Sequence, residues 1–208
     1  EWPSFTWNHE KLVNLLSLVS HQQGRLLGRM ESLGFSLQSE ANLAATTLEI
    51  LKSNEIEGEI LEHDEVRSSV ARQLGLDIAG LISTDRNIDG IVEVMIDATR
   101  NFRKPLSAER LFHWHKSLFP SEKSKSHTMT IGQWRTNTED NPMQVVSGPF
   151  GREQIHFRAP DSALIDKEMA DFINWFNEDD DLNPILKAAI GHLWFVTIHP
   201  FDDGNGRI

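Results

Sequence analysis

The chain has 208 residues, a formal net charge of −11 and no cysteine. This length fits one domain, or one domain with a small addition, and it can bury a core without disulfide or metal staples. The missing cysteines exclude disulfide scaffolds, thiolate nucleophiles and cysteine-ligated metal sites. The acidic balance removes the attraction on which nonspecific binding to nucleic acid or to an anionic membrane relies. Because no apolar run is long enough to span a bilayer, we expect a cytoplasmic protein that binds neither nucleic acid nor membrane.

Two helices are predicted at the N-terminal end. Asn8 is placed to cap the first helix, in which apolar residues from Leu12 to Met30 recur at helical spacing until Gly34 ends it. The second helix begins near Ser39 and ends at Gly58. We interpret the two helices as one unit and assign residues 1–80 to an N-terminal helical region.

Five further helical patterns follow and make the chain mainly helical. They cover about 62–74, 87–102, 107–118, 162–177 and 184–198. Two short β-prone runs, 143–147 and 154–158, lie on either side of Gly148-Pro149-Phe150-Gly151 and predict a single β-hairpin. The predicted fold class is therefore all-α with one small hairpin, both edges of which are unpaired. Residues 81–208 form the second region.

The last ten residues carry the chemistry. Pro200 breaks the preceding apolar helix just past His199. The chain must then turn sharply, and Gly204 and Gly206, on either side of Asn205, allow backbone amides to approach a ligand without obstruction by a Cβ atom. Such a turn forms an anion nest, and a polyphosphate is the ligand that it favours.

Three side chains of this segment complete a catalytic set. Arg207 adds a forked cation that is suited to phosphate. Asp203, at the rim, is placed to hold a divalent cation that bridges phosphates. His199, as a histidine, is suited to take a proton from an attacking hydroxyl near neutral pH. The alternative interpretation of Asp203 and Asn205 is a pair of ordinary turns, since both residues precede glycine.

The string from His199 to Arg207, HPFDDGNGR, resembles the Fic family signature H-P-F-x-[D/E]-G-N-G-R-x-x-R. The resemblance covers about residues 87–208 and includes Ile131-Gly132-Gln133-Trp134-Arg135, which is similar to the family's approach to its hairpin, the flap. The sequence ends at Ile208, inside the signature, so whether the second arginine is present stays open. The family fold is mainly helical with one hairpin, and it implies a catalytic core over 81–208.

This resemblance implies an enzyme that transfers AMP from ATP to a hydroxyl side chain of a target protein, with Mg²⁺ as cofactor. In the implied roles, His199 is the general base, Asp203 the Mg²⁺ ligand, Phe201 a core anchor, Gly204, Asn205 and Gly206 the phosphate cradle, and Arg207 a β-phosphate contact. Gly204 and Gly206 are similar to the AMP-transferring branch, whereas the kinase-like Doc branch has Ala and Lys there. The target protein is expected to dock on the flap, about 143–158, by β-augmentation. A homodimer is left open.

A second pattern, Ser53-Asn54-Glu55-Ile56-Glu57-Gly58, matches the family's inhibitory motif [S/T]-x-x-x-E-[G/N]. In the proteins that it resembles, this helix docks beside the ATP site and its glutamate pairs with the second arginine. We therefore expect Ser53 and Glu57 to be inhibitory; the alternative for Glu57 is a solvated carboxylate at a helix end. Two other functions stay open: Mg²⁺-dependent removal of AMP, with Glu57 activating a water, and a non-catalytic nucleotide-binding regulator.

Overall fold

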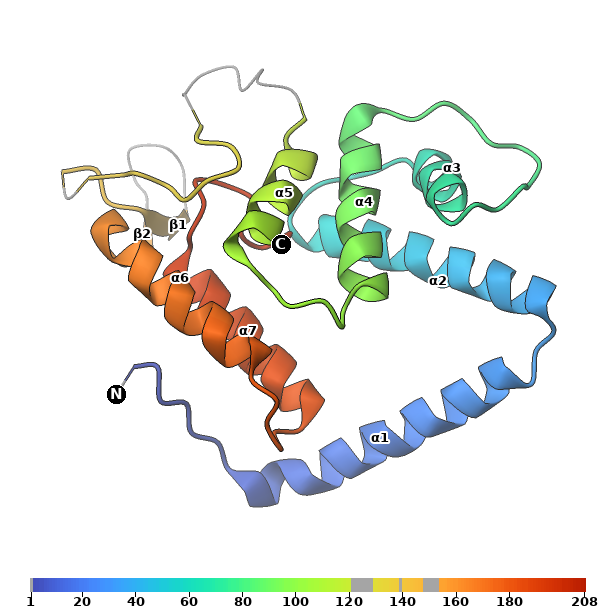
Figure 1. The fold of residues 1–208 in the computed structure, drawn as a ribbon, viewed down its shortest axis with the longest axis horizontal. Coiled ribbons are helices and arrows are strands. Elements are labelled where there is room, and N and C mark those ends of the chain that lie inside the picture. Colours follow the sequence, from blue (N-terminus) through green and yellow to red (C-terminus); the bar gives the residue numbers. More distant parts are fainter. Residues whose placement is uncertain (1, 121–128, 139, 148–153) are drawn as a thin grey trace.

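The computed structural model describes residues 2–120, 129–138, 140–147 and 154–208 (Figure 1). Within these ranges the chain forms seven helices and one hairpin. The elements are α1 (His9–Glu31), α2 (Phe35–Ile56), α3 (His63–Gln73), α4 (Arg86–Arg100), α5 (Ala108–Leu118), β1 (Gln144–Ser147), β2 (Gln154–Arg158), α6 (Ser162–Asn177) and α7 (Pro184–Ile198). The predicted mainly helical class with one hairpin is confirmed. None of the described helices is long and apolar enough to cross a membrane.

Side-chain caps fix where most helices begin. The predicted cap at Asn8 is confirmed, because its side-chain oxygen accepts a hydrogen bond from the Lys11 amide at 3.0 Å. The predicted start of α2 near Ser39 is wrong, since the helix begins at Phe35. Gln38 explains the difference: its side-chain nitrogen donates to the carbonyls of the preceding turn, so the chain enters α2 directly after Gly34.

One apolar core runs through the molecule from α2 to the loop after α7. In α2 the buried face consists of Leu43, Thr47, Ile50 and Asn54, and it packs on α3, which in turn packs on α4. Helices α6 and α7 lie side by side on the other flank (Figure 1). Phe201, in the loop after α7, is fully buried in the same core, which confirms its predicted role as an anchor.

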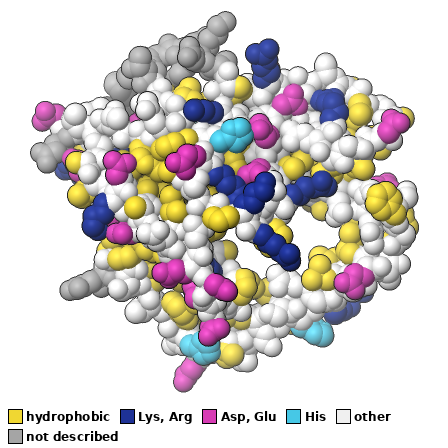
Figure 2. Space-filling view, in the orientation of Figure 1, with side chains coloured by type: hydrophobic (Ala, Val, Ile, Leu, Met, Phe, Trp, Pro, Cys, Tyr) yellow, Lys and Arg dark blue, Asp and Glu magenta, His cyan; other side chains and the backbone are white. Residues whose placement is uncertain are grey.

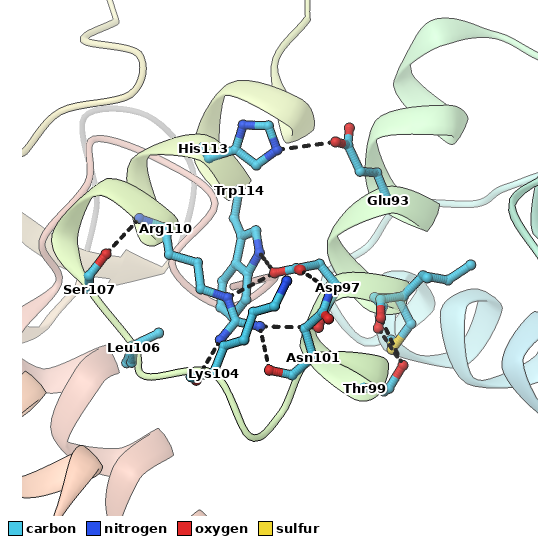
Figure 3. Close-up of polar contacts among 12 residues, drawn as sticks. Glu93, Asp97, Thr99, Asn101, Lys104, Leu106, Ser107, Arg110, His113 and Trp114 are labelled. Atoms are coloured by element: carbon cyan, nitrogen blue, oxygen red, sulfur yellow. Dashed lines mark hydrogen bonds and ion pairs between the residues drawn. The ribbon is translucent and has the colours of Figure 1, made fainter.

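A polar network fastens α4 to α5 (Figure 3). The Asp97 carboxylate accepts hydrogen bonds from Arg110 Nε and Trp114 Nε1, each at 2.8 Å. Burial raises the pKa of Asp97, but the hydrogen bonds from Arg110, Asn101 and Trp114 outweigh it, and the net shift is downward. The two helices also touch at Gly90, where an added Cβ would lie 1.8 Å from the Ser117 carbonyl oxygen. This pair of helices is therefore held rigidly, and α5 directs His115 toward the loop after α7.

The N-terminal arm, residues 2–31, is held quite differently. Trp2 and Phe5 pack on Trp194 of α7, with ring centroids 6.0 and 5.9 Å apart, but α1 buries none of its residues. Both predicted N-terminal helices are present, but they do not pack on each other along their length: α1 runs apart from α2 and bridges the far end of α2 and the α6–α7 flank (Figure 1). Figure 2 shows an opening between α1 and the rest of the molecule, with hydrophobic side chains on its rim.

Candidate active site

Helix α7 ends at Ile198, and the next residue, His199, adopts the left-handed backbone conformation, with φ 53° and ψ 59°. Its amide still donates to the Phe195 carbonyl at 2.9 Å. Pro200 cannot continue the helix, because it has no N–H and its ring would clash with the preceding turn. A non-glycine residue seldom adopts this backbone conformation, so the surrounding structure must hold His199 there.

The His199 imidazole is set up as a base. Its Nδ1 lies 3.2 Å from the Val196 carbonyl oxygen, and a carbonyl can only accept, so Nδ1 carries the proton and Nε2 keeps its lone pair. Burial lowers the pKa of His199, and the charge of Arg135 acts in the same direction, against the opposing effects of the Val196 carbonyl and Asp203. The ring is therefore neutral near pH 7, which is the state that a general base requires.

The loop after His199 is shaped by buried contacts. The side chain of Asn205 forms two hydrogen bonds with the backbone of Phe201. Its oxygen accepts from the Phe201 amide and its nitrogen donates to the Phe201 carbonyl, each at 2.9 Å. Asn205 therefore contributes to a cradle through its backbone amide. Within the described residues, the amides of Asn205 and Gly206 donate no hydrogen bond, which leaves both available to an anion. The chain forms a turn over 205–207, in which the amides of Arg207 and Ile208 donate to the Gly204 carbonyl at 3.1 and 3.2 Å.

The two glycines are required by space as well as by conformation. Gly204 has φ 79°, and a Cβ atom there would lie 2.9 Å from the Phe119 ring. A Cβ atom on Gly206 would lie 2.3 Å from Glu57 Oε1. The carboxylate of Glu57, at the end of α2, therefore rests against the turn that exposes the two unpaired amides, although the two segments are about 150 residues apart in sequence.

A cavity of about 320 Å³ joins these groups. Its lining consists of Glu57, Glu59, His199, Asp202, Asp203, Gly204, Asn205, Gly206 and Arg207. Every predicted site residue is thus brought together except Ser53, which is exposed and does not line the cavity. Glu59 is an addition that the sequence did not single out, because one more acid among the many glutamates of this region carries no distinguishing pattern.

Arg207 supplies the positive charge of the cavity. Its side chain is only 14% exposed, stacks over the Phe119 ring at 4.9 Å, and lies 4.0 Å from carboxylate oxygens of both Glu59 and Asp203. A planar guanidinium held against an aromatic face keeps its fork directed at neighbouring anions. The same fork would meet a phosphate in the cavity, in competition with the two carboxylates.

Asp203 fits the role of a partial Mg²⁺ site. Its Oδ1 accepts a hydrogen bond from the Gly204 amide at 2.6 Å, which fixes the carboxylate at the cavity wall. The described residues contain no group of three or more His, Asp or Glu side chains placed to hold a metal ion. Mg²⁺ commonly binds through one or two carboxylates, substrate phosphates and water, and a lone Asp203 beside a phosphate nest suits that mode.

Two residues that the sequence did not assign to the site hold the loop from outside. His115, predicted to have a packing or surface role, is fully buried and stacks on Phe201 with centroids 4.2 Å apart. Its Nδ1 accepts from the Gly132 amide at 2.9 Å, so its Nε2 donates to the Asp203 carbonyl at 3.2 Å. Burial lowers the pKa of His115, which keeps the ring neutral in this role. The second residue is Arg135, which is also almost fully buried.

A second cavity, of about 500 Å³, lies under the hairpin and adjoins the first at Asp202. Its lining consists of Asn137, Asn141, Pro142, Met143, Gln144, Ile155 and Asp202. Asp202 is fixed between the cavities, since its Oδ2 accepts from the Thr130 amide at 2.9 Å. Among the residues that the structure describes, β1 and β2 pair only with each other, and β2 is exposed along its whole length. The predicted tip, 148–151, lies outside the described residues.

Comparison with known proteins agrees with this geometry. The family model of the Fic/DOC family matches residues 105–208, half of the chain, and the model of a domain of unknown function (DUF4172) matches residues 1–76. The chain therefore belongs to the Fic/DOC family, as the signature predicted.

Among curated proteins, the chain is similar to the protein adenylyltransferase fic-1 of Caenorhabditis elegans, with 27% identity over 135 residues, or 62% of this chain and 24% of that protein. The fic-1 protein of Caenorhabditis briggsae is 43% identical over 51 residues, which cover 24% of this chain and 10% of the relative. The matched segments thus span a quarter or less of these relatives.

Two solved structures share the fold. A Fic family protein from Desulfovibrio desulfuricans G20 aligns with a TM-score of 0.61 at 22% identity, over 100% of this chain and 57% of its own. A Fic domain containing signaling protein from Bacteroides thetaiotaomicron aligns with a TM-score of 0.64 at 19% identity, over 90% of this chain and 67% of its own.

Proposed function

We propose that the protein is a protein adenylyltransferase, which transfers AMP from ATP to a hydroxyl group of a target protein. The observation that carries this proposal is His199, with its Nδ1 facing the Val196 carbonyl, in the same cavity as two unpaired backbone amides and Arg207. A base on one side and anion-binding groups on the other are what attack on a phosphate ester requires. The names of the C. elegans and C. briggsae relatives support the same activity.

In the proposed reaction, His199 Nε2 takes the proton of the target hydroxyl. The hydroxyl oxygen forms a bond to the α-phosphorus of ATP, the bond from that phosphorus to the bridging oxygen breaks, and pyrophosphate leaves with the electron pair. The amides of Asn205 and Gly206, together with Arg207, stabilise the negative charge on the departing phosphates. Asp203 would hold Mg²⁺, which supplies neutralisation of phosphate charge when bound.

The target segment is proposed to lie along the hairpin, over about 143–158. Support comes from the exposed β2 strand, whose pairing with β1 leaves an outer edge for another strand. The cavity beneath the hairpin, with side-chain amides of Asn137, Asn141 and Gln144, adjoins the first cavity at Asp202. A segment held there would bring its hydroxyl toward His199.

We further propose that the enzyme is auto-inhibited by Glu57. The carboxylate rests against Gly206, where a phosphate would bind the amides of the turn. Two negative groups cannot share this place without a large electrostatic cost, so ATP must displace the end of α2. Ser53 is exposed and does not line the cavity, so any part that it plays in inhibition is proposed to come from its place in α2 and not from contact with ATP.

The same position of Glu57 favours a second candidate, the removal of AMP from a modified protein. A carboxylate in one cavity with His199 is placed to orient a water for attack. The Glu57→Gly variant separates the two functions. If Glu57 only inhibits, the variant should transfer AMP faster than the parent; if Glu57 activates the water, the variant should remove AMP more slowly than the parent.

The matches to residues 1–76 and 105–208 support a further proposal, that residues 1–80 form a regulatory region and residues 81–208 the catalytic core. In that arrangement α2 is the element that connects the two, since it contacts α4 of the core and carries Glu57 into the cavity that the core residues line.

The direct test is incubation of the complete protein and its Glu57→Gly variant with ATP and Mg²⁺, followed by intact-mass measurement. We expect added AMP on the protein itself or on proteins of the source cell, and none with His199→Ala. Within these 208 residues any self-modification must fall on Ser or Thr, because they contain no tyrosine. Binding of ATP without any AMP addition by either protein would favour the non-catalytic regulator instead.

A further inference from the structure

Arg135 makes an unusual set of contacts for an arginine. The residue is 2% exposed, and its guanidinium donates to the carbonyl oxygens of His199 at 2.6 Å, Pro160 at 2.6 Å and Ile198 at 3.3 Å, and to the side-chain oxygen of Asn137. Among the residues that the structure describes, no carboxylate forms an ion pair with it. The buried charge is therefore spread over neutral oxygens, two of which, those of Ile198 and His199, lie at the end of α7.

These contacts act where His199 needs support. A helix leaves its last carbonyl groups without intrahelical partners, and at the end of α7 Arg135 takes up those of Ile198 and His199. The backbone amide of Arg135 also donates to the Pro200 carbonyl at 2.9 Å. Three successive peptide carbonyls around the left-handed residue are thus fixed by one side chain and one amide of Arg135.

We propose that Arg135 is a positioning residue for His199: it holds the His199 backbone in the left-handed conformation from which the imidazole lines the cavity. This inference rests on the proposed function only for its consequence on AMP transfer. The fork matters, because a lysine has the charge but cannot donate to two carbonyls and a third acceptor in one plane. The charge matters too, because Arg135 is the cation that faces His199 from outside the cavity and contributes to its lowered pKa.

His199 is surrounded by charged groups of both signs, which come from three segments. They are Arg135, Asp202, Asp203, Arg207, Glu57 and Glu59. Removing one cation from this set should raise the pKa of His199, because the remaining groups are mainly acidic. This shift reports the charge of Arg135, whereas its hold on the His199 backbone is measured by kcat.

The test compares Arg135→Gln, which loses both fork and charge, with Arg135→Lys, which loses only the fork. The matched control is Arg110→Lys, since Arg110 is also mostly buried and donates to the backbone carbonyls of Asp97, Asn101 and Lys104 away from the cavity. The first readout is the titration of His199 by NMR in protein labelled at histidine carbon, with His199→Ala to assign the signal. This readout needs no catalytic activity, so it stands even if the proposed function fails.

We expect Arg135→Gln to move the His199 titration to higher pH, while Arg135→Lys and Arg110→Lys leave it near that of the parent. The second readout is AMP transfer in the Glu57→Gly background. Both Arg135 variants should lower kcat roughly tenfold to a hundredfold, with the KM for ATP changed less than about threefold, because a displaced catalytic group costs rate more than binding. Arg110→Lys should lose stability without this loss of kcat.

An unchanged His199 titration together with an unchanged kcat in folded Arg135→Gln would overturn the proposal and leave Arg135 a structural residue. Should Arg135→Gln fail to fold, Arg135→Lys decides the question, since it keeps the charge and removes only the fork. A parent-like kcat in folded Arg135→Lys would equally overturn the proposal. Loss of AMP transfer in the parent, with the expected NMR shift in Arg135→Gln, would contradict the proposed function alone.

Discussion

The loop after α7 and helix α1 show two opposite ways of fixing a segment of chain. In the loop, Phe201 and Asn205 are buried and His115 and Arg135 bind its carbonyls from outside. Helix α1 is regular over 23 residues yet buries none of them, and Leu26 and Leu27 are 61% and 62% exposed. The loop has an irregular shape dictated by tertiary contacts, whereas α1 has a regular shape dictated by local hydrogen bonds and its cap. Substitutions should therefore act very differently in the two segments.

The largest effect is expected for His199→Ala. AMP transfer should fall by ~10² to 10⁴, because proton abstraction is lost, while ATP affinity should stay close to that of the parent, because the amides of Asn205 and Gly206 and the fork of Arg207 remain. Labelling rates and calorimetry with ATP measure the two quantities. A parallel loss of ATP affinity would mean that the shape of the loop depends on the imidazole itself, contrary to the comparison above.

The next effect is on stability, for Phe201→Ala. Removal of a fully buried aromatic side chain should lower the free energy of unfolding by ~3 to 5 kcal/mol, and the loop should lose ATP binding together with its shape. Denaturant unfolding, with ATP binding measured below the transition, checks both. Normal ATP affinity in a destabilised Phe201→Ala protein would show that the Asn205 and Arg135 contacts suffice to shape the loop.

A smaller effect, of ~1 to 3 kcal/mol or roughly five- to 150-fold, is expected for Glu57→Gly in the complete protein. Removing the carboxylate frees the turn at Gly206 and should raise ATP affinity and AMP transfer together. Glu55→Gly, near the same helix end and outside the cavity, is the matched control and should change neither quantity. Equal values for Glu57→Gly and the parent would assign Glu57 to the solvated surface.

The acid limb of the pH–rate profile offers a finer test of the loop. Because the pKa of His199 is lowered by burial, the ring stays neutral at pH values where an exposed histidine is already protonated. Activity in the Glu57→Gly background should therefore decline only below about pH 6.5, the ordinary histidine value. A decline centred above that value would show that the acidic groups of the cavity dominate over burial.

The smallest effect belongs to α1. Leu27→Ala should change the free energy of unfolding by no more than ~0.5 kcal/mol, since an exposed leucine loses little on truncation and alanine is a good helix former. The same measurement on Ile50→Ala, a buried position of α2, should give ~2 to 5 kcal/mol. A loss at Leu27 as large as at Ile50 would show that α1 is covered in solution and would remove the contrast with the loop.

The sequence predicted those features whose signals lie close together along the chain. Helix bounds followed from apolar spacing and caps, and the nest followed from nine consecutive residues. The roles of His115 and Arg135 could not be predicted, because folding brings them to the loop from about 65 to 90 residues away. No local sequence pattern indicates that either side chain binds the carbonyls of this loop. The exposure of α1 was missed for a related reason: periodicity identifies an apolar face, but it does not show whether any partner covers that face.

The two ends of the N-terminal arm have a consequence for how α2 moves. The aromatic residues Trp2 and Phe5 fasten one end to Trp194, and the turn before Phe35 joins the other end to α2. Between them α1 acts as a stiff rod of 23 residues, about 34 Å long. When the end of α2 leaves the cavity, it stays tethered at both flanks of the molecule, so its return is an intramolecular event governed by effective concentration and not by diffusion from solution. Under the proposed inhibition by Glu57, closure of the cavity would thereby be reversible on the same molecule, and the aromatic contacts of Trp2 and Phe5 would help to set how often the cavity is closed.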